Sequence, residues 1–380
     1  MKSKPAAILL AAVLAAGIGA CQNQDQGMAP ATTFGITEQA AKPAEPSSAP
    51  PEQDLASFTT EKPGVTPLPS PESPAIDYTK IKPYEVGQIM IVMYHGIVEG
   101  QAKDSYQRSA ADFWSDMEAL YERGYRLISL RDLVNNHITV EAGMTPVVFT
   151  FDDGLSSSFS LEERDGQLVP AENTGLWLME KFAEQHPDFG CTATFFINNN
   201  PFPGAGTIPQ RLGRLIDHGY DVGNHTLNHV DFHKADPETI QAEIGAVDQL
   251  IRSALPGYEG MGLSYPYGHH PDDAYRSYIT EGIYEGQTYT YQYAVNVGYD
   301  GMKPASPNRI GYNPMELSRV RGSDDAETDL GYFLRYYDEN PAYRYISDGN
   351  PDTVTLPHQY ESNVNLESLG DKELILYDLE

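Results

Sequence analysis

Cysteine is scarce in this chain of 380 residues, which contains only Cys21 and Cys191. Cys191 lies in an apolar run over residues 190–197, so we expect a packed structural thiol there rather than a nucleophile. If Cys21 carries a lipid, no second thiol remains for a disulfide, and the fold depends on its core alone.

Positive charge is also scarce. The chain has 25 Lys and Arg residues against 54 Asp and Glu residues, which gives a formal net charge of −29. Proteins that bind nucleic acid present a basic surface to the phosphates, and no basic stripe is available here. An anionic membrane surface is equally unfavourable for the chain. We therefore expect no nucleic-acid partner and no charge-driven membrane contact.

The apolar run over residues 6–16 is too short to span a membrane as a helix, which needs about 20 residues. Lys2 and Lys4 precede it and small residues lead to Cys21, a pattern typical of a cleaved export signal. A cysteine after small residues resembles the lipobox of bacterial lipoproteins, with cleavage before Cys21 and lipid on its thiol. The alternative is an ordinary signal peptide that is cut after Ala20.

Composition divides the chain into a lipoprotein signal peptide at 1–20, a disordered tether at 21–85 and a folded domain at 86–380. The tether is rich in Pro, Ala, Ser, Thr, Glu and Gln, a composition that favours extended conformations and builds no core. We expect an exported monomer that is held at the bacterial cell membrane by its N-terminal lipid alone and faces the cell envelope or the outside.

Short apolar runs recur from residue 89 onward and are typical of strands that are buried on both faces. They lie at residues 89–94, 147–151, 192–197, 220–223, 262–265 and 293–297. Stretches with apolar residues at helical spacing lie between several of them, chiefly at residues 110–123 and 237–255. Alternating strands and helices predict an α/β domain with a parallel sheet, although periodicity does not separate a barrel from an open sheet.

Two adjacent carboxylates, Asp152 and Asp153, follow the apolar run that ends at Phe151. Gly154 comes next and permits a sharp turn. The carboxyl ends of strands carry the reactive groups of α/β enzymes. Two neighbouring carboxylates repel each other unless a cation is near, so the pair favours a metal site. An ordinary Asp-Gly turn without a ligand is the alternative.

Two histidines with three residues between them, His225 and His229, follow another strand-like run. Their spacing predicts one face of a helical turn, from which both imidazoles can reach one ion. Because both segments follow strands, we expect the histidines and the Asp pair at the same end of the sheet. Two imidazoles and one carboxylate leave coordination positions open, which is typical of a catalytic metal. Chance spacing of exposed histidines is the alternative.

These segments resemble the motifs of the polysaccharide deacetylases, the NodB-homology enzymes of carbohydrate esterase family 4. The three motifs correspond to residues 150–154 (Thr-Phe-Asp-Asp-Gly), 225–229 (His-Thr-Leu-Asn-His) and 264–268 (Ser-Tyr-Pro-Tyr-Gly). The resemblance covers about residues 89–300. It implies a distorted (β/α) barrel that removes N-acetyl groups from amino-sugar polymers, or O-acetyl groups from some sugars.

Site roles follow from the same resemblance, residue by residue. Asp153, His225 and His229 are implied as ligands of a divalent metal, with zinc expected first and cobalt or nickel as alternatives. Asp152, beside the metal but not bound to it, is implied as the general base that takes a proton from water.

The substrate side of the site is implied in the same way. The backbone N–H of Tyr267 is expected to help hold the tetrahedral oxyanion. Tyr265, Pro266 and His95 are expected to contact the substrate. A satisfied structural histidine is the alternative for His95.

Two positions depart from the family pattern. The third motif often begins with an Arg that orients the general base, and Ser264 stands at that position here. Arg319 is the candidate replacement, because it resembles an Arg found late in lipoprotein-type members; a surface charge is the alternative. The general acid of a final Leu-x-His motif has a poor match at residues 356–358, which makes His358 a candidate and a solvated loop histidine its alternative.

The sequence therefore predicts a metal-dependent deacetylase that hydrolyses N-acetyl groups of an acetylated glycan, of the peptidoglycan or poly-N-acetylglucosamine type. One alternative is a carbohydrate O-acetyl esterase. Another is a weakly active or non-catalytic glycan-binding envelope lipoprotein, which the missing Arg and the unassigned acid favour. The intact Asp pair and histidine pair favour catalysis.

Overall fold

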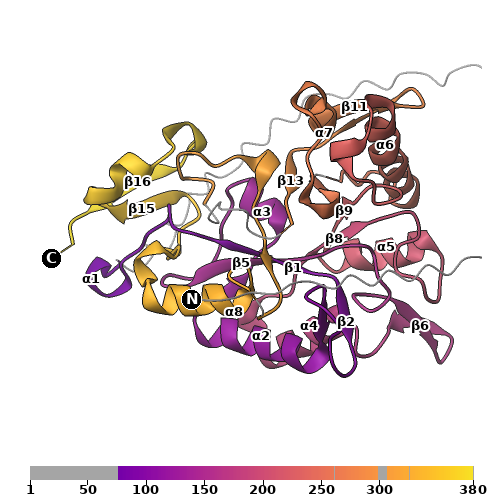
Figure 1. Ribbon diagram of the computed structural model, residues 1–380. Coiled ribbons are helices and arrows are strands. Elements are labelled where there is room, and N and C mark those ends of the chain that lie inside the picture. The colour runs from indigo at the N-terminus through magenta and orange to yellow at the C-terminus, as the bar shows by residue number, and fades with distance from the viewer. Residues whose placement is uncertain (1–75, 261, 298–305, 325, 380) are drawn as a thin grey trace, which may run out of the picture. The chain divides into compact units, whose positions relative to one another are not determined.

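Parallel strands form the centre of the fold in the computed structural model, which describes residues 76–379 except 261, 298–305 and 325. They follow the order β13-β10-β9-β8-β5-β1-β14, and β4 pairs with β5 beside this path (Figure 1). Their bounds are β1 Met90–Tyr94, β4 Tyr125–Leu127, β5 Thr145–Phe151, β8 Thr194–Ile197, β9 Asp221–Asn224, β10 Gly262–Ser264, β13 Tyr293–Val295 and β14 Val320–Arg321.

The strands coincide with the apolar runs that predicted them. Every residue of β1 and β5 is buried, so neither strand has a polar face that would produce an alternating pattern. All pairings along the path are parallel. The predicted α/β class and parallel sheet are confirmed.

The two ends of the strand path meet through Leu317. Its N–H donates to the carbonyl of Ala294 at 2.9 Å, and its carbonyl accepts from the N–H of Asn296 at 2.8 Å. Three residues later, Val320 pairs with Val92 of β1. The segment that ends in β14 therefore contacts both β13 and β1, and the sheet curls into the predicted distorted barrel.

Helices flank these strands, and four of the longer ones begin at a side chain that caps the first turn. The helices are α1 Tyr78–Ile81, α2 Ala110–Glu122, α3 Leu130–Val134, α4 Gly175–Gln185, α5 Ile208–Asp217, α6 Pro237–Ala254, α7 Ser277–Thr280 and α8 Leu330–Glu339. Asp236 caps α6 by accepting from the N–H of Thr239 at 2.8 Å. The predicted helices at 110–123 and 237–255 are thus confirmed within a residue or two.

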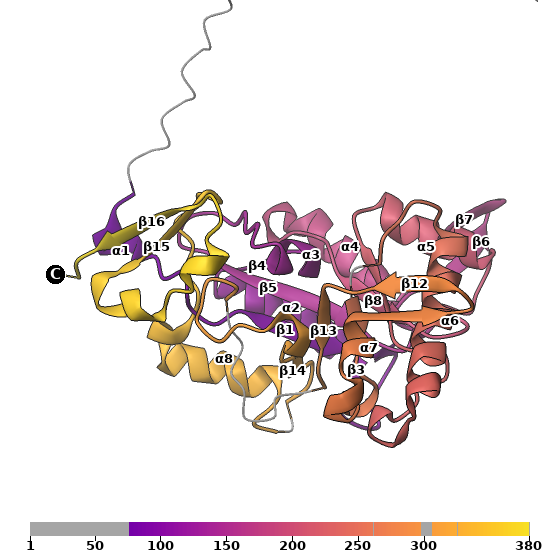
Figure 2. The same cartoon turned by 90° about the horizontal axis from the view of Figure 1, so that it is seen from above.

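Four two-stranded pairs lie outside the barrel. They are β2 Gly96–Val98 with β3 Gln107–Ser109, β6 Leu161–Arg164 with β7 Gln167–Pro170, β11 Glu281–Tyr284 with β12 Gln287–Thr290, and β15 Thr353–Pro357 with β16 Glu373–Tyr377. In both Figure 1 and Figure 2 the β15–β16 pair lies beside α1, whereas the β11–β12 pair lies beside α6.

The predicted signal peptide, Cys21 and the tether up to residue 75 lie outside the described residues. Residues 76–85, which were assigned to the tether, contain α1 and the buried side chains of Tyr84 and Glu85. The folded unit therefore begins before the predicted boundary at residue 86. No helix among the described residues is long and apolar enough to cross a membrane.

Candidate metal centre

Three potential metal ligands converge at the carboxyl ends of the barrel strands. Asp153 follows β5, and His225 and His229 follow β9. One ligand atom from each lies within 4.8 Å of the other two. Asp153 Oδ1 is 3.5 Å from His225 Nε2 and 3.8 Å from His229 Nε2. The predicted convergence of the two motifs is therefore what the fold produces.

His225 is the most informative member of the group because its ring is buried and oriented. Its Nδ1 lies 2.8 Å from the carbonyl oxygen of Ser264, which can only accept a hydrogen bond, so the proton belongs on Nδ1. Nε2 then carries a lone pair, and no group in the described part of the chain donates to it. A buried polar atom without a partner costs about 1–3 kcal/mol. Such an atom beside a carboxylate fits a metal ligand whose other nitrogen is fixed by the backbone.

The segment from His225 to His229 is a loop, so the predicted helical turn is wrong. Asn198 Nδ2 donates to the carbonyls of His225 and Thr226, both at 2.7 Å. Glu243 of α6 accepts from the backbone and side chain of Asn228, both at 2.7 Å. These polar contacts hold the loop, and the two rings lie edge to face with centroids 4.7 Å apart.

Four residues at the site have positive φ although none is glycine. The values are 70° for Asp153, 64° for Thr226, 54° for His229 and 59° for Tyr267. The left-handed region costs an ordinary L-residue roughly 1–2 kcal/mol, less for Asp. The surrounding fold therefore stabilises a backbone path that these residues would not adopt alone, as is common at functional sites.

Asp152 forms a fully buried ion pair with Arg319. Nη1 donates to Asp152 Oδ1 and Nη2 donates to Oδ2, both at 2.7 Å, and neither side chain is exposed. Ser264 Oγ donates to Oδ2 at 3.0 Å and accepts from Arg319 Nη2 at 2.9 Å. Arg319 therefore lies where the predicted base-orienting role requires it, and Ser264 bridges the pair. The alternative of a surface charge is wrong for Arg319.

The ion pair sets the charge of Asp152. Burial by itself would raise the pKa of this carboxyl, but the charge of Arg319 and the hydrogen bonds from it hold the pKa well below its usual range. Burial likewise opposes ionisation of Asp153, but the adjacent His225 keeps the pKa of this carboxyl below its usual value. Both carboxyls are therefore anionic at neutral pH, which suits Asp153 as a metal ligand and Asp152 as a general base.

The cavity over these groups has a volume of about 250 Å³. It is lined by His95, Tyr106, Asp152, Asp153, His225, His229, Tyr267 and Val297. His95 therefore lies in the site, as predicted. Tyr106 and Val297 were missed as site residues, because neither belongs to one of the three motifs.

Tyr265 and Pro266 do not line this cavity, so their predicted contact with substrate is wrong. Tyr265 is 3% exposed and packs in the core, where its hydroxyl donates to the carbonyl of Met315 at 3.3 Å. Pro266 is buried as well. The tight turn at residues 266–268 carries Tyr267 to the surface instead, with 57% of it exposed.

His358 lies away from the site, and its prediction as general acid is wrong. It follows β15, which lies near the amino ends of the barrel strands: Thr355 accepts from the N–H of Glu85, shortly before β1. The His358 side chain is 56% exposed and hydrogen-bonds to Asp378 at 3.2 Å. The solvated loop histidine was the correct alternative.

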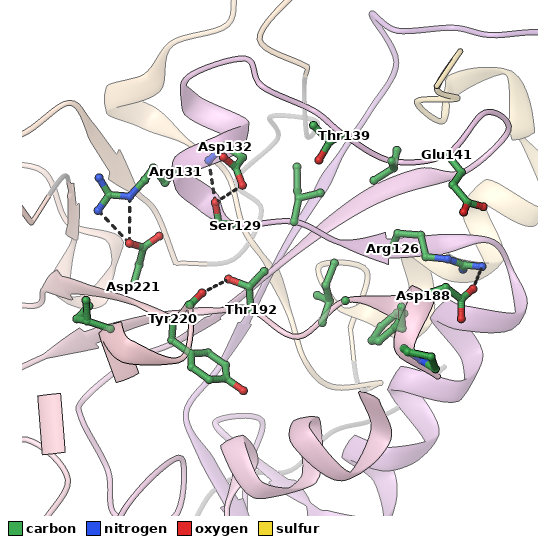
Figure 3. Close-up of a pocket in the computed structure, with 18 of the residues that line it drawn as sticks. Arg126, Ser129, Arg131, Asp132, Thr139, Glu141, Asp188, Thr192, Tyr220 and Asp221 are labelled. Carbon is green, nitrogen blue, oxygen red and sulfur yellow. Dashed lines mark hydrogen bonds and ion pairs between the residues drawn. The ribbon is translucent and has the colours of Figure 1, made fainter. Parts of the chain in front are cut away.

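A second cavity, of about 920 Å³, lies at the opposite end of the barrel, where β8 and β9 begin. Two ion pairs line it, as Figure 3 shows: Arg131 lies 2.9 Å from Asp221, and Arg126 lies 2.8 Å from Asp188. We call this the amino-end groove. It is larger than the metal cavity, but its two arginines are already neutralised and it contains no group of potential metal ligands.

Comparison with known proteins gives a match between residues 178–284 and the family described as Polysaccharide deacetylase. A chitooligosaccharide deacetylase of Sinorhizobium fredii is 27% identical over 141 residues, which cover 37% of this chain and 55% of that protein. One of a Bradyrhizobium strain is 28% identical over 91 residues, 24% of this chain and 40% of that protein. The chain thus spans about half the length, or less, of these relatives.

Among solved structures, a deacetylase of Streptococcus pyogenes determined with acetate aligns with a TM-score of 0.47 and 17% identity, over 66% of this chain and 98% of that one. The family match includes the two histidines and the third motif; the Asp pair lies before it and reaches the same site through β5. The resemblance predicted from the motifs is confirmed: residues 178–284 match the polysaccharide deacetylase family.

Proposed function

We propose that this chain is a metal-dependent deacetylase that hydrolyses N-acetyl groups of an amino-sugar polymer in the cell envelope or outside the cell. One observation carries the proposal. The buried and unpartnered Nε2 of His225 points toward Asp153 beside an arginine-bound carboxylate, at the end of the barrel where reactive groups are expected.

The donor set fits a divalent metal. Asp153, His225 and His229 supply one carboxylate oxygen and two imidazole nitrogens, a set that suits zinc and also cobalt or nickel, and that leaves positions open. When bound, such an ion polarises a carbonyl and acidifies water. His229 is 29% exposed at its side chain, so the open side of the site faces the cavity.

The chain's own residues complete the site. Asp152 is held anionic and fixed in one orientation by Arg319, so it can accept a proton from water without first rotating. The turn at Tyr267 presents backbone at the cavity, where an N–H can stabilise negative charge on the acetyl oxygen.

His95 is the proton donor that we assign in place of His358. It lines the cavity and is not one of the three ligands. Burial lowers the pKa of His95 overall, and the nearby charges of Asp152 and Asp153 offset only part of this shift. A leaving amine needs a proton, and an imidazole in the same cavity is the residue type that supplies one near neutral pH.

Acetate release tests the proposal. Wild-type protein with added Zn²⁺, Co²⁺ or Ni²⁺ should release acetate from N-acetylglucosamine oligomers, and chelation should abolish the release. Asp153→Asn removes a ligand charge while Asn still tolerates positive φ, so activity should fall at least about a hundredfold. Asp165→Asn is the matched control, because Asp165 also has positive φ (54°) but is exposed in the β6–β7 turn.

Three results would contradict this function. Undiminished activity in Asp153→Asn would exclude the assigned site. Release of acetate from acetylated xylan but not from chitin oligomers would favour the O-acetyl esterase instead. Bound metal without acetate from any glycan would favour a binding protein, although the pairing of Arg319 with Asp152 removes the main argument for that alternative.

Export and lipid anchoring at Cys21 complete the proposal for this chain. Mass spectrometry of the mature protein should find a lipid on an N-terminal Cys21. An unmodified Cys21, or an N-terminus at another residue, would exclude the anchor. The proposed monomer is tested by sedimentation of the detergent-solubilised protein.

A further inference from the structure

Two exposed tyrosines, Tyr106 and Tyr267, flank the candidate metal centre. They are 47% and 57% exposed, and both line the cavity over the metal ligands. Aromatic rings of this size usually contribute far more of their surface to a core. An exposed pair at one small cavity therefore suggests a ligand with apolar faces.

Both rings are held in place by a histidine of the site. Tyr106 lies edge to face with His95, with centroids 5.0 Å apart and planes at 76°. Tyr267 contacts His229 in the same way, at 4.4 Å and 75°. Neither ring has to be ordered when a ligand arrives, which lowers the entropic cost of binding.

The backbone of Tyr106 is fixed as well, although it lies in a loop. Its N–H donates to Asp104 Oδ1 at 2.9 Å, and its carbonyl accepts from the N–H of Gly96 at 3.3 Å. The next residue, Gln107, begins β3. Tyr106 therefore stands at the edge of a strand pair, not at the tip of a free loop.

The barrel places the two tyrosines on opposite sides of the metal ligands. Tyr106 is attached to the β1 side through β2 and β3, whereas Tyr267 follows β10. In the strand order, β9, β8 and β5 lie between β10 and β1, and β5 and β9 carry Asp153 and the histidines. A molecule bound over Asp153, His225 and His229 thus has the ring of Tyr106 on one side and the ring of Tyr267 on the other.

We infer that Tyr106 is a specificity-determining residue that stacks on a sugar ring next to the one being deacetylated, with Tyr267 as the opposite wall. The inference rests on the proposed function. A pyranose has apolar C–H faces that suit the face of an aromatic ring. The site then takes an internal sugar, flanked on both sides by its neighbours in the polymer, in preference to a single N-acetylglucosamine.

Kinetics against chain length test this inference. Wild-type protein should show a KM for N-acetylglucosamine tetramer and pentamer at least about tenfold below that for the monosaccharide. Tyr106→Ala should raise the KM for the long oligomers about tenfold, more than it changes kcat, and should reduce the preference for length. Tyr106→Phe keeps the ring and should restore most of the affinity.

Tyr343→Ala is the control, since Tyr343 is 48% exposed but does not line the cavity. Equal KM values for long oligomers in wild type, Tyr106→Ala and Tyr343→Ala would overturn the assignment of Tyr106. A wild type that releases no acetate from any oligomer would instead overturn the proposed function, and the inference with it.

Discussion

Backbone with positive φ occurs at both ends of the barrel, but different residue types adopt it at each end. At the amino-end groove, left-handed φ values fall on glycines, among them Gly190, Gly219 and Gly257. At the metal centre they fall on residues with side chains, including Asp153 and His229. Glycine adopts this region without strain, and the other residues do not. Between these two cavities, the strained backbone occurs only in the one where particular side chains are used.

Charge shows the same contrast. In the amino-end groove Arg131 pairs with Asp221, and both side chains are partly exposed. At the other end Arg319 and Asp152 are completely buried, and His225 Nε2 has no partner. A large cavity with neutralised charges is therefore less informative about function than a small one with an unsatisfied buried atom.

Removing the arginine at each end gives the largest expected difference. Arg319→Gln leaves Asp152 buried without its cation, which should lower the free energy of unfolding by about 3–5 kcal/mol and reduce activity severely. Arg131→Gln removes a partly exposed partner and should cost no more than about 1 kcal/mol, with activity unchanged. Urea denaturation followed by acetate assays measures both.

Restoring charge separates the roles of Arg319. Arg319→Lys keeps the cation but cannot form both hydrogen bonds, so stability should recover more than activity. The contrast between the two ends would be lost if Arg319→Gln and Arg131→Gln destabilised the protein equally.

A buried acid near the amino ends of the strands predicts a pH dependence of stability. Burial and the charge of Asp348 raise the pKa of Glu85 to about 8, from a usual value of 4.5. The folded protein then binds a proton that the unfolded chain releases, so stability is full below about pH 4.5 and falls by up to a few kcal/mol as pH rises to about 8. Glu85→Gln, which carries no charge, should lose this slope in denaturation curves across that range. A slope of the same size in the variant would show that another group is responsible.

Exchanging residue types at the positive φ positions should give the smallest effects, of opposite sign. Gly257→Ala in the amino-end groove places a Cβ at φ 83° in open space, so strain alone should cost about 1 kcal/mol. Tyr267→Gly relieves strain at the metal centre and should leave stability unchanged or slightly higher while activity falls. Thermal unfolding detects both; a loss of stability above 1 kcal/mol in Tyr267→Gly would contradict the account of stored strain.

Much of the barrel could be predicted from the sequence because its strands are buried on both faces. The run that ends at Phe151 has one interpretation, and the Asp pair after it must lie at a strand end. The histidine pair likewise follows a strand-like run, which placed it with Asp153 at the same end of the sheet. These are local features, set by residues that are adjacent or nearly adjacent in the chain.

Features that depend on distant contacts were harder to predict. The loop at residues 225–229 takes its shape from Asn198 and Glu243, so the four-residue spacing suggested a helix that does not form. Arg319 could be named as a candidate, but only the closure of the barrel through Leu317 brings it to Asp152.

The wrong or missing predictions for single side chains also arise from contacts between residues that are distant in the chain, or from turns. Tyr265 and Tyr267 stand two residues apart in one motif, and the turn between them sends one into the core and the other to the surface. Tyr106 belongs to no motif and reaches the site because β3 pairs with β2. Leu356-Pro357-His358 matches the Leu-x-His pattern, but it lies at the end of β15, near the amino ends of the barrel strands.

Zinc stoichiometry tests most directly whether Asp153 and the two histidines form one metal site. Purified, chelator-treated wild type and Asp165→Asn should each bind one zinc ion per chain in a calorimetric titration, with a matching rise in thermal stability. Asp153→Asn should bind zinc at least tenfold more weakly and show little stabilisation. Equal zinc binding by Asp153→Asn and Asp165→Asn would contradict the assignment of the metal centre.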